Sequence, residues 1–121
     1  MSTTAWTVVF AVDAVADLIL IEAHLTEAYQ SFGESPTEAR QHAETRIEAI
    51  IAGAERLATA PFRGTVRDDL QSGMRHLALD GAIYWFTSDT NLKQVRVLAI
   101  FFGGQDHQRH MLVRLLQRGS P

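Results

Sequence analysis

Two long helical patterns with almost no linker between them constrain this chain more than any other feature. Residues 14–33 and 35–61 each carry an apolar stripe at helical spacing, and only Glu34 separates them. The second pattern has a strong start signal, because Ser35 can cap a helix, Pro36 suits its first turn and Glu38 completes a capping box. With Gly33 as a stop between them, the two segments predict an antiparallel helical hairpin.

The first of these helices is apolar on more than one side. One stripe runs along Ala14, Leu18, Ile21, Leu25, Ala28, Tyr29 and Phe32. Ala16, Leu20 and Ala23 form a second strip, roughly opposite the first. Since a helix that is apolar on both sides is normally covered on both sides, this strip predicts a contact. The contact is either with the second helix, with another protein or with a second copy of the chain.

The rest of the chain reads as strands and one closing helix. Residues 6–13 predict a strand that ends at Asp13, which can cap the first helix. After a polar loop at 61–73, residues 73–79 and 82–88 alternate with period two around a tight Asp80-Gly81 turn. Residues 93–102 are the most apolar strand and are placed centrally, and 105–118 close the chain as a short helix. The prediction is an α+β fold of order β-α-α-β-β-β-α, with the helical hairpin on a small, mainly antiparallel, four-stranded sheet.

Length and composition restrict the class of protein. A chain of 121 residues predicts a single domain, residues 1–121. The absence of cysteine excludes disulfides and thiolate metal sites, and no segment reaches the length of about 18 apolar residues that a membrane span needs. With no signal sequence in view, we expect a cytoplasmic protein without membrane contact. The net charge of −3 lacks the basic excess that is typical of nucleic-acid binding.

The polar segment after the last strand, GGQDHQRH, admits several kinds of site. Gly103-Gly104 lies between a strand and a helix, but no GxGxxG pattern or lysine–serine pair accompanies it, so we interpret it as a sharp turn. His107 and His110 can share one helix face, and Asp106 and His76 could join them around a metal. The zincin pattern is absent, and we expect neither a metal nor a cofactor. The sequence also has no GxSxG elbow.

Arg75 is unusual because it shares a strand face with Leu77 and Leu79. An arginine in such a position usually pairs with a carboxylate or a carbonyl group. We expect Asp106 to be that partner, and the alternative is an arginine that faces a ligand.

The order of these pieces resembles the RelE/ParE toxin superfamily of bacterial toxin–antitoxin systems. The likeness covers about residues 6 to 112, and its motifs are specific in their order and spacing. The matching pieces are Ala16-Asp17-Leu18, Pro61-Phe62-Arg63-Gly64, Gly73-Met74-Arg75, Ile83-Tyr84-Trp85-Phe86, and Ile100-Phe101-Phe102-Gly103-Gly104-Gln105-Asp106.

One branch of this superfamily, the RelE-like toxins, cuts messenger RNA on the ribosome with basic residues on the strands and the last helix. This sequence departs from that pattern, because residues 82–88 contain no cation, Gln105 stands where a basic residue is expected and Met111 lies near the position of a tyrosine. Should the chain be a nuclease of this type, acting on ribosome and mRNA, the residues available for catalysis are Arg75, His76, His107 and Arg109.

The other branch resembles this chain more closely. ParE-like toxins of plasmid stabilisation systems act by protein–protein interaction on DNA gyrase and are neutralised by a cognate antitoxin. The resemblance therefore implies a toxin with a partner-binding surface and no confident catalytic residue. The residues that we assign to partner binding are Ala16, Leu20, Ala23, Arg75, Gln105 and Asp106. A non-toxic relative that forms a homodimer or larger homo-oligomer is a further alternative.

Overall fold

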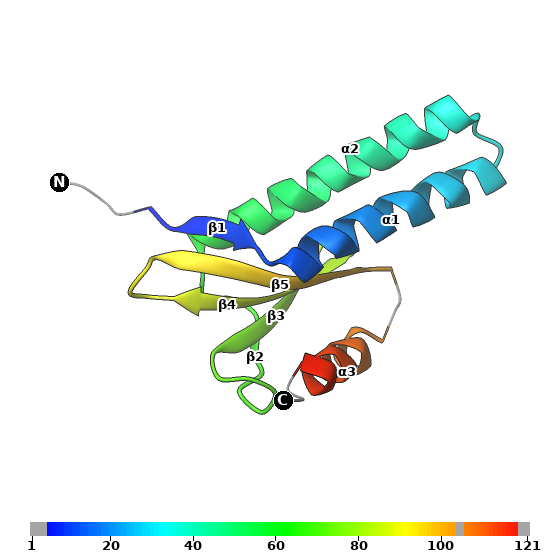
Figure 1. The fold of residues 1–121 in the computed structure, drawn as a ribbon. Coiled ribbons are helices and arrows are strands. Elements are labelled where there is room, and N and C mark those ends of the chain that lie inside the picture. Colours follow the sequence, from blue (N-terminus) through cyan, green and yellow to red (C-terminus); the bar gives the residue numbers. More distant parts are fainter. Residues whose placement is uncertain (1–4, 104–105, 119–121) are drawn as a thin grey trace.

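In the computed structural model, which describes residues 5–103 and 106–118, two long helices lie on one face of a twisted sheet and a short helix lies on the other (Figure 1). The sheet order is β1-β5-β4-β3-β2, with β1 parallel to β5 and the other pairs antiparallel. The predicted α+β class is confirmed, and the predicted elements occur in the predicted order, with one further strand before β3. The elements are β1 (Thr7–Phe10), α1 (Val12–Ser31), α2 (Pro36–Glu55), the 3₁₀ helix η1 (Arg56–Thr59), β2 (Thr65–Val66), β3 (Met74–Leu79), β4 (Ala82–Asp89), β5 (Gln94–Phe102) and α3 (His107–Arg118).

The sheet has five strands where the sequence predicted four. The additional strand, β2, lies within the segment that was predicted to be a polar loop. Its two residues pair with Arg75 and His76 of β3, and two residues are too few to show an alternating pattern. The strand β5 is an interior strand, as expected, but the middle position of the five belongs to β4.

The helical hairpin forms largely as predicted. Ser35 and Glu38 make both hydrogen bonds of the capping box, with Ser35 Oγ accepting from Glu38 N at 3.2 Å and Ser35 N donating to Glu38 Oε1 at 3.0 Å. At the end of α1, Gly33 has a φ of +105°, which favours glycine. The prediction that Asp13 caps α1 is wrong, because the cap residue is Ala11 and Asp13 lies in the first turn. An acidic side chain there still interacts favourably with the helix dipole.

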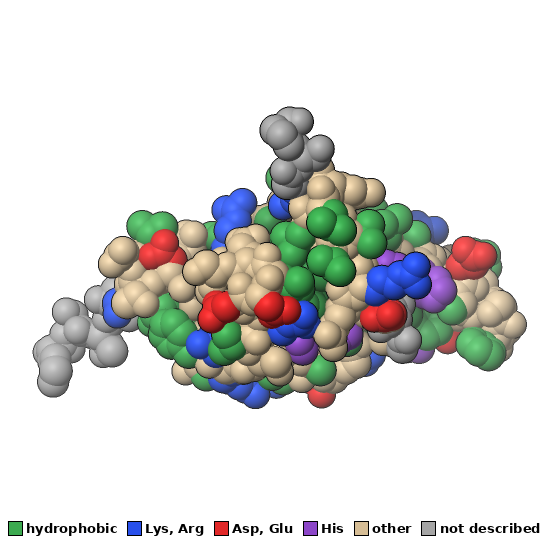
Figure 2. Space-filling view, turned by 90° about the horizontal axis from the view of Figure 1, so that it is seen from below, with side chains coloured by type: hydrophobic (Ala, Val, Ile, Leu, Met, Phe, Trp, Pro, Cys, Tyr) green, Lys and Arg blue, Asp and Glu red, His purple; other side chains and the backbone are tan. Residues whose placement is uncertain are grey.

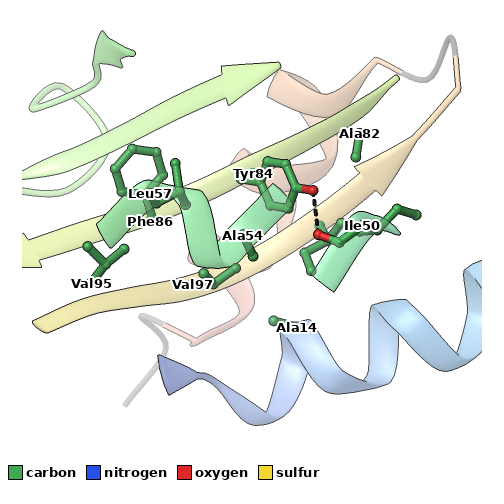
Figure 3. Packing of buried hydrophobic residues seen from close by; sticks show 10 residues of the cluster. Ala14, Ile50, Ala54, Leu57, Ala82, Tyr84, Phe86, Val95 and Val97 are labelled. Carbon is green, nitrogen blue, oxygen red and sulfur yellow. Dashed lines mark hydrogen bonds between the residues drawn. The ribbon is translucent and has the colours of Figure 1, made fainter. Parts of the chain in front are cut away.

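The main core fills the space between the hairpin and the sheet (Figure 3). Tyr84 of β4 is buried there, and its hydroxyl donates to the carbonyl oxygen of Ile50 in α2 at 2.6 Å. Burial raises the pKa of Tyr84 to about 12. Gly53 lets α2 approach this ring, since a Cβ at that position would lie 2.5 Å from the tyrosine oxygen.

A second, smaller core lies between α3 and the opposite face of the sheet. Its buried members are Met74, Trp85, Ala99, Phe101 and Met111. A β-bulge supports this arrangement, because Trp85 pairs with Ala99 while the next residue, Phe86, pairs with Val97. The extra residue, Leu98, packs at the edge of the second core. In the part of the chain that the structure describes, no helix has the length and apolar character to cross a membrane.

Candidate interaction site

A continuous apolar stripe on α1 is exposed to solvent. We call it the α1 apolar face, and it consists of Val12, Val15, Ala16, Ile19, Leu20 and Ala23. These positions alternate in steps of three and one, which places them along one side of a helix. Leu20 alone is 67% exposed. Exposed apolar groups that are contiguous, in contrast to scattered ones, mark surfaces that bind other proteins.

The three residues of the predicted second strip, Ala16, Leu20 and Ala23, are all part of this exposed face. The alternative in which α2 covers that strip is therefore wrong. The helix uses its other side, including Ala14 and Leu25, to pack on the body of the protein. The predicted inner stripe also ends earlier than expected, since Phe32 at the tip of the hairpin is 87% exposed.

A cleft of about 310 Å³ opens beside the α1 apolar face. It lies between α1, the last residues of β5 and α3, and we call it the α1–β5–α3 cleft. Its walls combine apolar rings with titratable groups, and the lining residues are Asp17, Leu20, Ile21, His24, Ile100, Phe101, Phe102, His110 and Arg114. Leu20 belongs to both features, so the exposed face and the cleft form one surface.

The base of the cleft is a buried ion pair. Asp17 is 5% exposed, and its two oxygens accept hydrogen bonds from Arg114 Nη1 at 2.8 Å and Arg114 Nη2 at 2.6 Å. Asp17 Oδ2 also accepts from the backbone N–H of Ile100 at 2.9 Å. These hydrogen bonds to Asp17 raise the pKa of Arg114, whose guanidinium also lies 4.8 Å from the ring centroid of Phe101. The pair joins α1, β5 and α3 at one point.

Sequence reasoning missed this pair, although Asp17 was part of a matching motif. A signal was present, because Asp17 lies between Ala14 and Ile21 on the inward side of an apolar helix. A carboxylate in such a position needs a cationic or N–H partner. The sequence alone offers several arginines, and it does not say which of them reaches Asp17.

A second group of polar side chains lies under the N-terminal end of α3. We call it the histidine–tryptophan cluster, and it contains His76 of β3, Trp85 of β4, His107 of α3 and Arg67. The indole Nε1 of Trp85 donates to His107 Nδ1 at 3.1 Å, and the two imidazole centroids are 5.0 Å apart. Burial and, secondarily, the charges of His107 and Arg67 lower the pKa of His76. Burial lowers the pKa of His107, and Arg67 adds to this effect while Asp106 opposes it.

Arg67 was also not predicted. Its guanidinium donates to both carboxylate oxygens of Asp69 at 2.9 Å and to Gln108 Oε1 at 2.8 Å, and it lies 5.7 Å from the ring centroid of Trp85. Asp69 raises the pKa of Arg67, chiefly through this hydrogen bonding. The arginine therefore links the segment after β2 to the start of α3.

Arg75 does not pair with Asp106, so that prediction is wrong. Arg75 Nη1 donates to the carbonyl oxygen of Phe62 at 2.7 Å, and its guanidinium lies 5.5 Å from the Phe62 ring centroid. Asp106 instead caps α3, because its Oδ1 accepts from Arg109 N at 3.2 Å. The carbonyl partner is closer in the chain and orders the loop that precedes β2. Gln105 lies outside the described residues.

The four residues proposed for a nuclease are only partly brought together. His76 and His107 adjoin each other, whereas Arg75 pairs with Phe86 in the register of β3 and β4 and so faces the hairpin side of the sheet. Arg109 is exposed on α3. His107 and His110 do not converge either, because His110 stacks on Phe101 at a centroid distance of 5.9 Å. Across residues 5–103 and 106–118, no three histidine, aspartate or glutamate side chains form a group that could hold a metal ion.

Comparison with solved structures identifies the fold. The chain is similar to a chain of the chromosomal ParDE TA system from P. aeruginosa, with 19% identity and a TM-score of 0.62, over 82% of this chain and 97% of that one. It is also similar to a chain of the toxin–antitoxin complex RelBE2 from Mycobacterium tuberculosis, with 17% identity and a TM-score of 0.58, over 86% of this chain and 98% of that one. No protein-family model and no curated protein sequence matches it. The predicted resemblance is thus confirmed in three dimensions, and the chain has the ParE/RelE fold.

Proposed function

We propose that this protein is the toxin component of a type II toxin–antitoxin system of the ParE-like, plasmid-stabilising kind. It acts in the cytoplasm by protein–protein interaction and is neutralised by a cognate antitoxin. The observation that carries the proposal is the exposed α1 apolar face, which continues into the α1–β5–α3 cleft. A surface of this kind needs a protein partner, because leaving it in water forgoes the free energy of burial.

The chemistry of this surface suggests how an antitoxin segment would bind. An amphipathic helix or extended segment would place apolar side chains on the α1 apolar face and one larger apolar side chain in the cleft. Arg114, His24 and His110 are among the residues that line the cleft. A carboxylate of the antitoxin beside the anchoring side chain would meet these groups. Figure 2 shows hydrophobic side chains at the surface on the α3 side, among basic (Lys or Arg), acidic and histidine side chains.

The test compares two exposed leucines. Leu20 in the α1 apolar face is 67% exposed and Leu92, in the turn between β4 and β5, is 66% exposed. We expect Leu20→Glu and Leu92→Glu to fold equally well, since neither leucine is part of the core. Only Leu20→Glu should weaken antitoxin binding, by at least about tenfold if the leucine is a central anchor worth more than 1.4 kcal/mol. Calorimetry with the antitoxin encoded beside the gene measures both variants. Unfolding of Leu20→Glu, or equal binding by both, contradicts the placement of the antitoxin.

We further propose DNA gyrase as the target. Expression of the chain without its antitoxin should then produce DNA breaks and an SOS response, and co-expression of the antitoxin should suppress both. Arrested translation with cut transcripts would point to the ribosome instead. A chain that produces neither effect would be the non-toxic, self-associating relative.

The second candidate function is a RelE-type, ribosome-dependent endoribonuclease. One observation favours it, namely the histidine–tryptophan cluster, in which two histidines with lowered pKa values lie beside an arginine. Imidazoles that are neutral near pH 7 can exchange protons, and a guanidinium can stabilise a charged phosphate. Under this function, His76→Ala should abolish transcript cleavage without loss of the fold. Under the gyrase function, the same variant should remain toxic.

A further inference from the structure

The N-terminal end of α3 is attached to the sheet through a hydrogen bond that only a neutral imidazole can accept. Trp85 Nε1 can only donate, so His107 Nδ1 must carry a lone pair. Trp85 is fully buried. If His107 took up a proton at Nδ1, the indole N–H would lose its acceptor inside the protein, and an unsatisfied buried donor is costly.

The surroundings also oppose a positive charge on His107. Arg67 and His76 contribute cationic or potentially cationic groups from the segment after β2 and from β3, and both lie at the same cluster. The carboxylate of Asp69 is engaged in a two-pronged ion pair with Arg67. Asp106 is the favourable neighbour, but its Oδ1 already accepts from the backbone of α3. His107 is moreover the first residue of α3, where the helix dipole is positive.

We propose that the histidine–tryptophan cluster is a pH-sensitive latch, in which protonation of His107 releases the N-terminal half of α3 from the sheet in mildly acidic solution. The C-terminal half stays tethered through Arg114 to Asp17 and through Arg118 to Asp13. The latch therefore opens α3 as a hinge and uncovers Met111 and the buried ring of Phe101. It operates in the isolated chain and does not depend on the toxin function.

The direction of the pH response follows from the lowered pKa values of both histidines. In the folded protein these values lie below the ordinary 6.5. The folded state therefore binds fewer protons than the unfolded or undocked state once the pH falls below about 6.5. The docked form is favoured fully at pH 7.5 and is lost progressively as the pH falls through the range below 6.5. A histidine pKa that is lower by 1 in the docked form than in the undocked form changes the docking equilibrium by a factor of about ten.

Hydrogen exchange of the backbone amides tests the latch in the full chain. After correction for intrinsic exchange, amides of α3 should exchange faster at pH 5.5 than at pH 7.5, because docking lowers the pKa of His107. Amides of α2 should show no comparable change, because α2 lies on the other face of the sheet. In a Trp6→Phe background, Trp85 is the only tryptophan, and its emission should shift to longer wavelength over the same pH range.

Three variants separate the latch from a general loss of stability. His107→Gln offers Trp85 an amide oxygen that does not titrate, so α3 should stay docked at pH 5.5. His107→Ala removes the acceptor at every pH, so α3 should exchange rapidly even at pH 7.5. His110→Gln, on the same helix but outside the cluster, should respond as the wild type does. The proposal is overturned if α3 of the wild type exchanges no faster at pH 5.5, if α2 accelerates equally, or if His107→Gln keeps the wild-type response.

Discussion

Breaking the buried pair between Asp17 and Arg114 should destabilise the whole protein and free α3. The side chains of Asp17 and Arg114 are 6% and 29% exposed. Replacing Arg114 by Met leaves a buried carboxylate whose remaining partner is the N–H of Ile100. Removing one member of a buried ion pair typically costs 3–5 kcal/mol, and because Arg114 retains some contact with water we expect about 3 kcal/mol. At this chain length, such a loss lowers the melting temperature by roughly 10 °C.

Replacing the other member of the pair, Asp17, by Asn should reduce the free energy of unfolding by less than Arg114→Met does. Asp17→Asn can keep one oxygen for the Ile100 N–H and one N–H of Arg114, but its amide NH2 group replaces the other oxygen and cannot accept the second hydrogen bond from the guanidinium. We expect a loss of about 2 kcal/mol. The double variant, Asp17→Asn with Arg114→Met, buries no uncompensated charge. Its loss of unfolding free energy should therefore be smaller, by about 2 kcal/mol, than the sum of the losses in the two single variants.

Urea denaturation followed by circular dichroism measures all three variants, with Arg118→Met as the control. Arg118 pairs with Asp13 in an exposed setting, where an ion pair contributes at most about 1 kcal/mol. Hydrogen exchange of the α3 backbone amides reports whether α3 detaches from the sheet before the rest of the protein unfolds. Strict additivity of the two single losses, or a loss from Arg114→Met no larger than from Arg118→Met, would refute the reasoning.

Two other changes probe the helical hairpin. Gly53→Ala places a methyl group 2.5 Å from the Tyr84 hydroxyl and should cost about 1–3 kcal/mol by calorimetry, with partial relief when Tyr84→Phe removes that oxygen. Ser35→Ala removes half of the capping box and should cost about 1 kcal/mol in urea denaturation. A Ser35→Asp variant, which restores an acceptor at the cap, should recover most of that loss.

Local signals along the chain predicted most of the fold. The capping box at Ser35 and the Asp80-Gly81 turn are encoded by a few neighbouring residues, and the backbone adopts what they predict, with positive φ values of 50° and 85° at the turn. The features that the sequence did not predict depend on contacts between distant segments. The strand β2 forms because β3 presents a free edge, and its two residues alone have no strand pattern.

The candidate site was harder to predict than the fold, because its geometry depends on which distant groups meet. The apolar strip at Leu20 was visible in the sequence, but its exposure followed only from how α2 packs. Arg75 was recognised as needing a partner, yet the carbonyl that it reaches belongs to Phe62, 13 residues earlier. Asp17 and Arg114 are 97 residues apart, and pairing at that separation leaves no periodic trace in the sequence.

The short strand β1 explains why the cleft lies where it does. β1 pairs with β5 only from Gln94 to Val97, while β5 continues to Phe102. The last of these pairs involves Val97, and the bulge in β5 at Leu98 follows directly. Beyond this point the first segment of the chain is no longer a strand and continues as α1.

The edge of β5 that β1 leaves unpaired would expose backbone N–H groups, which invite pairing with another strand. The carboxylate of Asp17 lies where a longer β1 would have paired with β5, and it accepts the hydrogen bond from the Ile100 N–H in place of a strand. Arg114 neutralises the charge of this carboxylate. A longer β1 would fill the space beside Ile100 and Phe101 that now forms the cleft. The cleft and the buried ion pair are therefore consequences of one feature, the early end of β1.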